Sequence, residues 1–170
     1  LIKQGQTYDR IRQHQRALTT FRSIQKIDAP KLLRKEFLIQ SYEQIGLSHL
    51  RQRELAKARR IFQKGLDLLG TTPKDLLWKI KLENSLAAVD LRGGDIAKAQ
   101  ARYQKTIKLS EEKLSERERS IITNSELGEA LLTSGKAKES IPLLIKELKS
   151  AETVHHVERM ATRYYLLGEA

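Results

Sequence analysis

Few residues in this chain have the types and spacing that catalytic and metal sites require. Glu152 and His155 have the Glu-x-x-His spacing that places two metal ligands on one helix face. Carboxylate-bridged metal sites need a second copy of this motif and further glutamates, and the four histidines of the chain supply no second copy. The alternative is a solvated pair or a pair between repeats, and we expect no metal site.

Other catalytic patterns are equally incomplete. Gly135-Lys136 lacks the upstream glycine and the following Ser or Thr of a phosphate-binding loop. The neighbouring carboxylates Glu111 and Glu112 precede Lys113, so ion pairing on a solvated helix surface accounts for them. The chain has no cysteine, which excludes disulfides, thiol catalysis and thiolate metal ligands. The sequence therefore predicts a protein that is not an enzyme, with no catalytic residues and no cofactor.

The composition favours long amphipathic helices. Of 170 residues, 39% are apolar, 31% are charged and only 5% are aromatic. The formal net charge is +11, of which +7 belongs to residues 1–35. No apolar run approaches the roughly 18 residues of a membrane span. We expect no membrane span and a cytoplasmic location.

Small and large residues recur at a fixed period of 41 residues. In the segment 39–72, a glycine at 46 is followed by an alanine at 58 and a phenylalanine at 62. Shifts of 41 residues give the sets Gly5, Ala17, Phe21; Ala87, Ala99, Tyr103; and Gly128, Ser140, Leu144; a further step of 40 reaches Gly168. Such a period indicates a solenoid of stacked helical hairpins. Glycine inside a helix costs about 0.5–1 kcal/mol relative to alanine, so we expect these glycines to allow close approach of the second helix through its small residue.

Apolar periodicity and helix-end signals divide the chain into helices. We expect helices over about 1–11, 13–27, 30–51, 54–69, 74–91, 96–114, 116–132 and 136–152, with a joint near Ser115. Thr72 and Asp95 are predicted N-caps, and Pro73 suits the first helical position. Leu1, Tyr8 and Ile11 are predicted core positions of the first helix.

The order of a small residue, a turn glycine, an alanine and an aromatic residue resembles the tetratricopeptide repeat (TPR) family. Gly94 and Gly135 stand where that family has its turn glycine, whereas Arg12 and Arg53 stand there in the earlier repeats. The period exceeds the family's usual length of about 34 and is similar to the lengthened repeats of bacterial regulators. The resemblance implies an all-α, right-handed superhelical solenoid of antiparallel helix hairpins. It covers one repeat domain, 1–170, with units of about 1–29, 30–70, 71–111, 112–152 and a partial unit 153–170. We expect this domain to be a fragment of a larger protein with flanking domains.

In that family the first helix of each unit lines a concave groove that binds a partner. Placed by their phase relative to the glycine, the implied groove residues are Gln6, Arg10, Gln40, Glu43, Leu47, Lys81, Asn84, Ala88, Ser125, Glu129 and Tyr165. An Asn or Gln side chain can bind a peptide backbone through one donor and one acceptor, and Arg10 or Lys81 could bind a carboxylate. The alternative is that these residues form the polar face of an exposed helix.

The second helices carry many basic residues outside their core faces. They are Arg12, Arg16, Arg22 and Lys26, followed by Lys57, Arg59, Arg60 and Lys64. Such a surface suits an acidic protein partner or a contact within the chain, although it could also serve solubility alone. Nucleic acid is the less favoured partner, because aromatic residues for base stacking are scarce.

The expected function is a non-catalytic scaffold whose groove binds a protein or peptide segment. The first alternative is a regulatory sensor segment that binds a small peptide or effector within a larger signalling or transcription regulator. The second alternative is an RNA-binding solenoid.

Overall fold

The computed structural model describes residues 1–27, 31–115, 131–132, 138, 140–142, 144–145, 148, 165 and 168. In these residues the only regular secondary structure is α-helical, which confirms the predicted all-α class. The chain divides into two compact units, Leu1–Gly93 and Gly94–Ala170, and the boundary falls at the turn within the predicted repeat 71–111. The helices of the first unit are α1 (Ile2–Arg10), α2 (His14–Ile24), α3 (Lys31–Arg51), α4 (Leu55–Asp67) and α5 (Pro73–Arg92).

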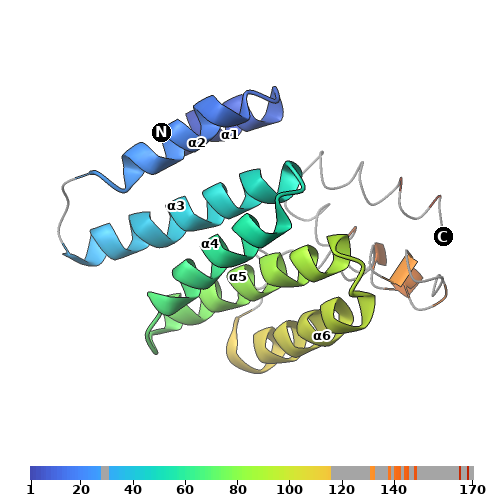
Figure 1. Cartoon of the computed structure of the whole chain (residues 1–170). Helices are drawn as coiled ribbons and strands as arrows, with labels where there is room; N and C mark the ends of the chain where they lie inside the picture. The colour runs from blue at the N-terminus through green and yellow to red at the C-terminus, as the bar shows by residue number, and fades with distance from the viewer. Residues whose placement is uncertain are drawn as a thin grey trace. The chain divides into compact units, whose positions relative to one another are not determined.

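Each helix of the first unit packs on the next one along the chain. Contacts join α1 to α2, α2 to α3, α3 to α4 and α4 to α5, and the alternate pairs α1/α3 and α3/α5 also touch. Figure 1 shows α3 between the α1/α2 pair and the α4/α5 pair. Three-residue connections at 11–13 and 52–54 reverse the chain, so α1/α2 and α3/α4 form antiparallel hairpins. These two hairpins correspond to the helix pairs predicted for the first two repeat units.

Side-chain hydrogen bonds show that α1 and α3 run parallel. Near the middle of both helices, Gln6 Nε2 donates to Gln44 Oε1 over 3.1 Å. Close to their carboxyl ends, Ser48 Oγ donates to Asp9 Oδ1 over 2.8 Å. The bonded residues are 38 and 39 positions apart in the sequence, close to the repeat period. The first helices of consecutive units are therefore stacked side by side, nearly in register.

The same arrangement joins α3 to α5 at both ends. Near the start of the two helices, Lys35 Nζ donates to Asp75 Oδ1 over 2.7 Å, across 40 positions of sequence. At the other end, Arg92 Nη1 donates to the Leu50 carbonyl oxygen over 3.1 Å, across 42 positions. Because the two amino-terminal ends lie together and the two carboxyl-terminal ends lie together, α5 is parallel to α3.

Two helix glycines lie against aromatic rings. A Cβ built on Gly5 would lie 2.7 Å from Cδ1 of Phe21, and one built on Gly46 would lie 2.6 Å from Cδ1 of Phe62. In both hairpins the ring on the second helix fills the space left by the glycine. We expected the small residue of the second helix, Ala17 or Ala58, to lie against the glycine. The group nearest to each glycine is instead the aromatic ring. Gly168 has the same phase, yet a Cβ there would meet no atom within 4 Å, and Gly128 lies outside the described residues.

The predicted small and large positions of the second helices are buried throughout. Relative exposure is 0% at Ala17, Phe21, Ala58, Phe62, Ala99, Tyr103, Ser140 and Leu144. In the first unit these residues belong to two apolar clusters, one around Phe21 and one around Phe62. Helix α3 contributes Ile45 to the first cluster and Ile39 and Leu50 to the second. It is therefore the central helix of this unit.

The turns within both hairpins have the same backbone geometry. Arg12 and Arg53 each have φ of 59°, in the left-handed region, and Gly94 at the next position of this phase has φ of 85°. The amide of Gln13 donates to the Tyr8 carbonyl, and the amide of residue 54 donates to the carbonyl of residue 49. These bonds, five residues back, define the Schellman motif that commonly ends a helix.

Other helix ends match the sequence in part. Thr72 caps α5 with Pro73 at its first position, as predicted, and Asp75 completes a capping box. The prediction that Leu1 and Ile11 belong to the core is wrong, because each is 56% exposed. Ile11 follows the end of α1 and lies in the turn, where helical periodicity no longer determines which way a side chain faces.

In the second unit, α6 covers Ile96–Lys113. Asp95 is at its N-cap position, as predicted, but its side chain makes no capping hydrogen bond. Leu114 has an extended backbone, which agrees with the predicted joint near Ser115. The helices predicted for 116–132 and 136–152 fall largely outside the described residues. Within the part of the chain that the structure describes, every helix is too short or too polar to cross a membrane.

Candidate functional site

Most of the predicted groove residues lie on the three parallel helices of the first unit. Gln6 and Arg10 belong to α1, residues 40, 43 and 47 to α3, and residues 81, 84 and 88 to α5. Since α1 and α5 both contact α3, these side chains come from neighbouring helices. Ser125 and Glu129 lie outside the described residues, and Tyr165, in the second unit, is 67% exposed.

A chain of amide and carboxylate groups crosses from α1 to α3. Gln6 donates to Gln44, and Gln44 Nε2 in turn donates to Glu43 Oε2 over 3.2 Å. Burial raises the pKa of Glu43 above its usual value, and the positive charge of Lys81 and the Gln44 hydrogen bond offset this only in part. Gln44 is buried and was not predicted as a site residue, because the sequence gives no sign of its contact with α1.

Lys81 continues the polar row onto α5. Its ammonium nitrogen lies 5.0 Å from the centroid of the Trp78 ring, within the range of a cation–π interaction. The same ammonium attracts the carboxylate of Glu43 on α3. Trp78 is half-buried and packs against the apolar cluster around Phe62. Lys81 therefore already interacts with Trp78 and Glu43, which makes it less suitable for binding a partner's carboxylate.

The remaining predicted residues differ in how accessible they are. Gln40 is half-buried and its side chain makes no hydrogen bond with the described part of the chain, so its side-chain amide is available to a partner. Asn84 is only 6% exposed. Leu47 and Ala88 are half-buried and pack against the apolar cluster around Phe62, whereas Arg10 is exposed. Gln40 is the most suitable residue of this set for binding a peptide backbone.

A buried carboxylate that sequence reasoning missed holds α1, α2 and α3 together. The side chain of Asp9 is 1% exposed and accepts a hydrogen bond from Ser48. His14 Nδ1 lies 2.7 Å from its Oδ1, and Arg51 pairs with its Oδ2. The repeat period could have indicated this cluster, because Arg51 and Arg92 are 41 positions apart. Each arginine donates to a residue 42 positions earlier, Asp9 and Leu50 respectively.

The basic residues of α4 are partly engaged within the unit. Arg59 pairs with the buried carboxylate of Asp90 over 2.7 Å, and Lys57 pairs with Glu54 over 2.5 Å. A shallow depression on this helix is lined by Ala56, Arg59, Arg60, Gln63, Lys64 and Asp67. Among the described residues, no group of three or more His, Asp or Glu side chains could hold a metal ion, and residues 152 and 155 lie outside them.

Comparison with known proteins adds no family. No protein-family model matches the chain, and no curated protein matches it either. The resemblance to tetratricopeptide repeats therefore remains a prediction.

Proposed function

We propose that this chain is a non-catalytic scaffold of tetratricopeptide-like hairpins that binds a partner's peptide segment on the face of α1, α3 and α5. The observation that carries this proposal is the row of polar side chains across three parallel helices. It runs from Gln6 through Gln44 and Glu43 to Lys81. The groups of this row are engaged with one another and order the face of the stacked helices, while the amide of Gln40, one helical turn before Gln44 on α3, is left to pair with the backbone of an extended peptide.

The packing supports a solenoid that continues by repetition. Helices 41 positions apart are held parallel by bonds at both ends, as in the pairs Lys35–Asp75 and Arg92–Leu50. Each unit then offers the next one an equivalent face. A stack of this kind forms an extended surface whose side chains are already ordered. Little conformational entropy is lost on binding, because the scaffold does not fold around its partner.

The experiment uses the 170-residue chain and peptides selected against it from a random display library. Affinities of the selected peptides are measured by fluorescence anisotropy for the wild type and for Gln40→Ala. We expect this variant to bind about fivefold more weakly, since a side-chain amide that pairs with a peptide backbone contributes about 1 kcal/mol.

The matched control is Gln63→Ala, which removes the same amide from the exposed depression on α4. This control should bind the selected peptides as tightly as the wild type does. Equal affinity of Gln40→Ala and wild type, together with weaker binding by Gln63→Ala, would place the binding surface on α4 and refute the proposal. Arg59→Glu is unsuitable as a control, because Arg59 neutralises the buried Asp90.

A further inference from the structure

Two exposed arginines occupy backbone positions that favour glycine. Arg12 and Arg53 have φ of 59°, whereas at the next position of the same phase the chain has Gly94. A side chain in this region costs free energy because its Cβ crowds the backbone. Neither arginine makes an ion pair or hydrogen bond through its side chain with the described part of the chain. The backbone hydrogen bonds of the Schellman motif hold both turns in this conformation, but no side-chain bond with the described residues accounts for an arginine where glycine is favoured, which suggests a role outside the first unit.

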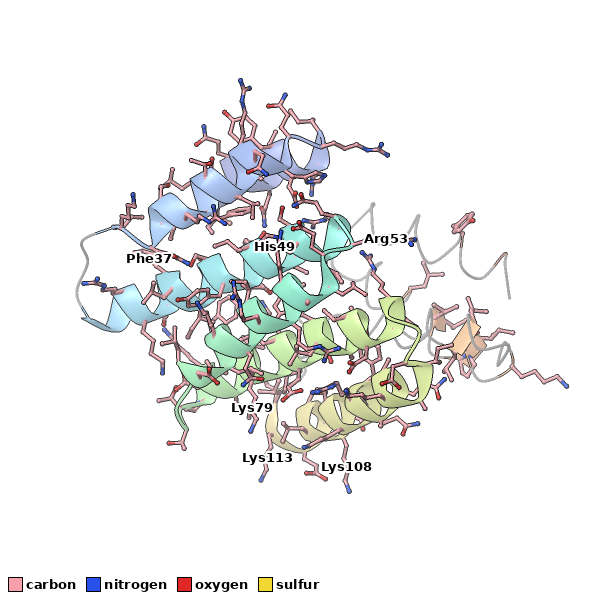
Figure 2. The ribbon with its side chains drawn as sticks, viewed as in Figure 1. Phe37, His49, Arg53, Lys79, Lys108 and Lys113 are labelled. Carbon is pink, nitrogen blue, oxygen red and sulfur yellow. The ribbon has the colours of Figure 1, made fainter. Side chains whose placement is uncertain are left out.

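The two turns lie at the same end of the first unit. Since α1 and α3 are parallel, the turns that follow them are neighbours, and Figure 2 shows Arg53 at the turn between α3 and α4. Glu54 is the acidic residue of these turns, and it is already paired with His49 and Lys57. The nearby Asp9 is buried, as described above. The exposed charge of this edge is therefore positive.

We infer that Arg12 and Arg53 form an edge that binds an acidic, extended segment of a partner protein. Guanidinium groups bind carboxylates through paired hydrogen bonds, and two of them one repeat apart define a spacing as well as a charge. Packed helices lie about 8–10 Å apart, and a segment in the extended polyproline II conformation advances about 3.1 Å per residue with three residues per turn, so every third side chain faces the same side. Carboxylates three positions apart in the segment would therefore match the two arginines.

The surroundings favour a protein segment over nucleic acid. Binding of single strands relies on exposed aromatic rings that stack on bases. Tyr8, the aromatic residue closest in sequence to the first turn, is half-buried with the Arg16 guanidinium 6.0 Å from its ring centroid. Ile11, beside Arg12, is 56% exposed and offers an apolar contact that suits a peptide side chain.

The test compares the wild-type chain with the double variant Arg12→Gly, Arg53→Gly. The probe is a fluorescent twelve-residue peptide with glutamate at every third position and serine and alanine elsewhere. We expect the double variant to bind about tenfold more weakly, because two charge-assisted contacts are lost. Its urea midpoint should not fall below that of the wild type, since glycine relieves the backbone strain. Weaker binding would then not be explained by unfolding.

Two controls separate this edge from general charge attraction. The variant Lys26→Gln, Lys64→Gln removes the same charge from the ends of α2 and α4 that lie away from these turns, and should bind within about twofold of wild type. A peptide of the same composition with its glutamates adjacent should bind more weakly than the spaced one.

Equal losses of affinity in both double variants, or no loss in either, overturn the inference. Tighter binding of an oligouridylate that is lost with the two arginines would make nucleic acid the occupant and also overturn it. Gln40→Ala should leave affinity for the spaced peptide unchanged, so failure of the groove proposal can be distinguished from failure of this one.

Discussion

The ring of Phe62 fills the space that a side chain at Gly46 would need. The three atoms nearest to a Cβ at this position all belong to that ring. The same relationship holds between Phe21 and Gly5, 41 positions earlier in the chain. A glycine that costs helix stability is thus retained where the second helix inserts an aromatic side chain. The two hairpins of the first unit therefore share this contact between helices, which helix propensity alone would disfavour.

Gly46→Ala should therefore destabilise the first unit although alanine favours helix. Overpacking against a buried ring costs about 1–3 kcal/mol, which exceeds the helix-propensity gain of about 0.5–1 kcal/mol. We expect a net loss of about 1 kcal/mol in the free energy of unfolding. Urea denaturation followed by the fluorescence of Trp78, the single tryptophan of the chain, measures this unit directly.

Two comparisons test the cause of that loss. Gly168→Ala changes a helical glycine of the same phase that has open space around it, so it should keep the helix-propensity gain and stabilise the second unit by about 0.5–1 kcal/mol, measured by circular dichroism. Adding Phe62→Leu to Gly46→Ala should cost less than the sum of the two single changes, because the smaller side chain makes room. Additive effects in this cycle would show that the ring is not what excludes a side chain at 46.

Sequence alone was sufficient to predict the buried small and large positions of the second helices. Ala58 and Phe62 in α4, and their equivalents in each unit, are buried because the same packing problem recurs at the same phase. The Thr72–Pro73 start of α5 was also predictable, since N-cap and first-turn preferences act locally. Local chemistry and repetition are the two properties that one sequence shows directly.

Contacts between units were not predictable from local pattern. Asp9 reads as a surface residue of a polar helix, but its partners Ser48 and Arg51 are 39 and 42 positions away. Gln44 likewise becomes buried only because α1 packs on α3. Of the predicted groove residues, Glu43 and Lys81 turned out to interact with each other, which phase alone could not indicate.

Arg53→Gly should stabilise the first unit. A non-glycine residue in the left-handed region costs about 1–2 kcal/mol, and the additional entropy that glycine loses on folding offsets part of the gain. We expect the free energy of unfolding to rise by about 0.5–1 kcal/mol, measured by urea denaturation with Trp78 fluorescence. The converse change, Gly94→Ala at φ of 85°, should lower stability by about 1 kcal/mol, seen as a lower midpoint by circular dichroism. A fall in stability for Arg53→Gly would mean that the arginine makes a stabilising contact in solution.

Asp75→Asn should weaken the start of α5 in a pH-dependent way. The hydrogen bond from Lys35 is the main cause that lowers the pKa of Asp75 below its usual value of 3.8; burial opposes this shift and the bonds with Thr72 add to it. A lowered folded-state pKa contributes stability that is present above the unfolded-state pKa and is lost as the pH falls through the folded-state pKa. We expect a loss of about 1 kcal/mol at pH 7 that shrinks below pH 3.8. Denaturation of wild type and variant across this range checks it, and a difference independent of pH would contradict the assigned ion pair.

Glu43→Gln should stabilise the first unit at pH 7, whereas Asp75→Asn should destabilise it. Burial is the largest cause acting on the pKa of Glu43 and raises it above its usual value of 4.5, so the ionised carboxylate is unfavourable in the folded chain. A raised folded-state pKa for an acid gives stability that is complete below the unfolded-state pKa and is lost as the pH rises through the folded-state pKa. Glutamine keeps an oxygen that can accept the Gln44 hydrogen bond and removes the charge, so the variant should be more stable than wild type at pH 7 and equally stable below pH 4.5. Urea denaturation at pH 7 and pH 4 measures both. If the variant were less stable at pH 7, the attraction between Glu43 and Lys81 would outweigh the cost of burial, and the polar row between α3 and α5 would be an ion pair that holds the stack together.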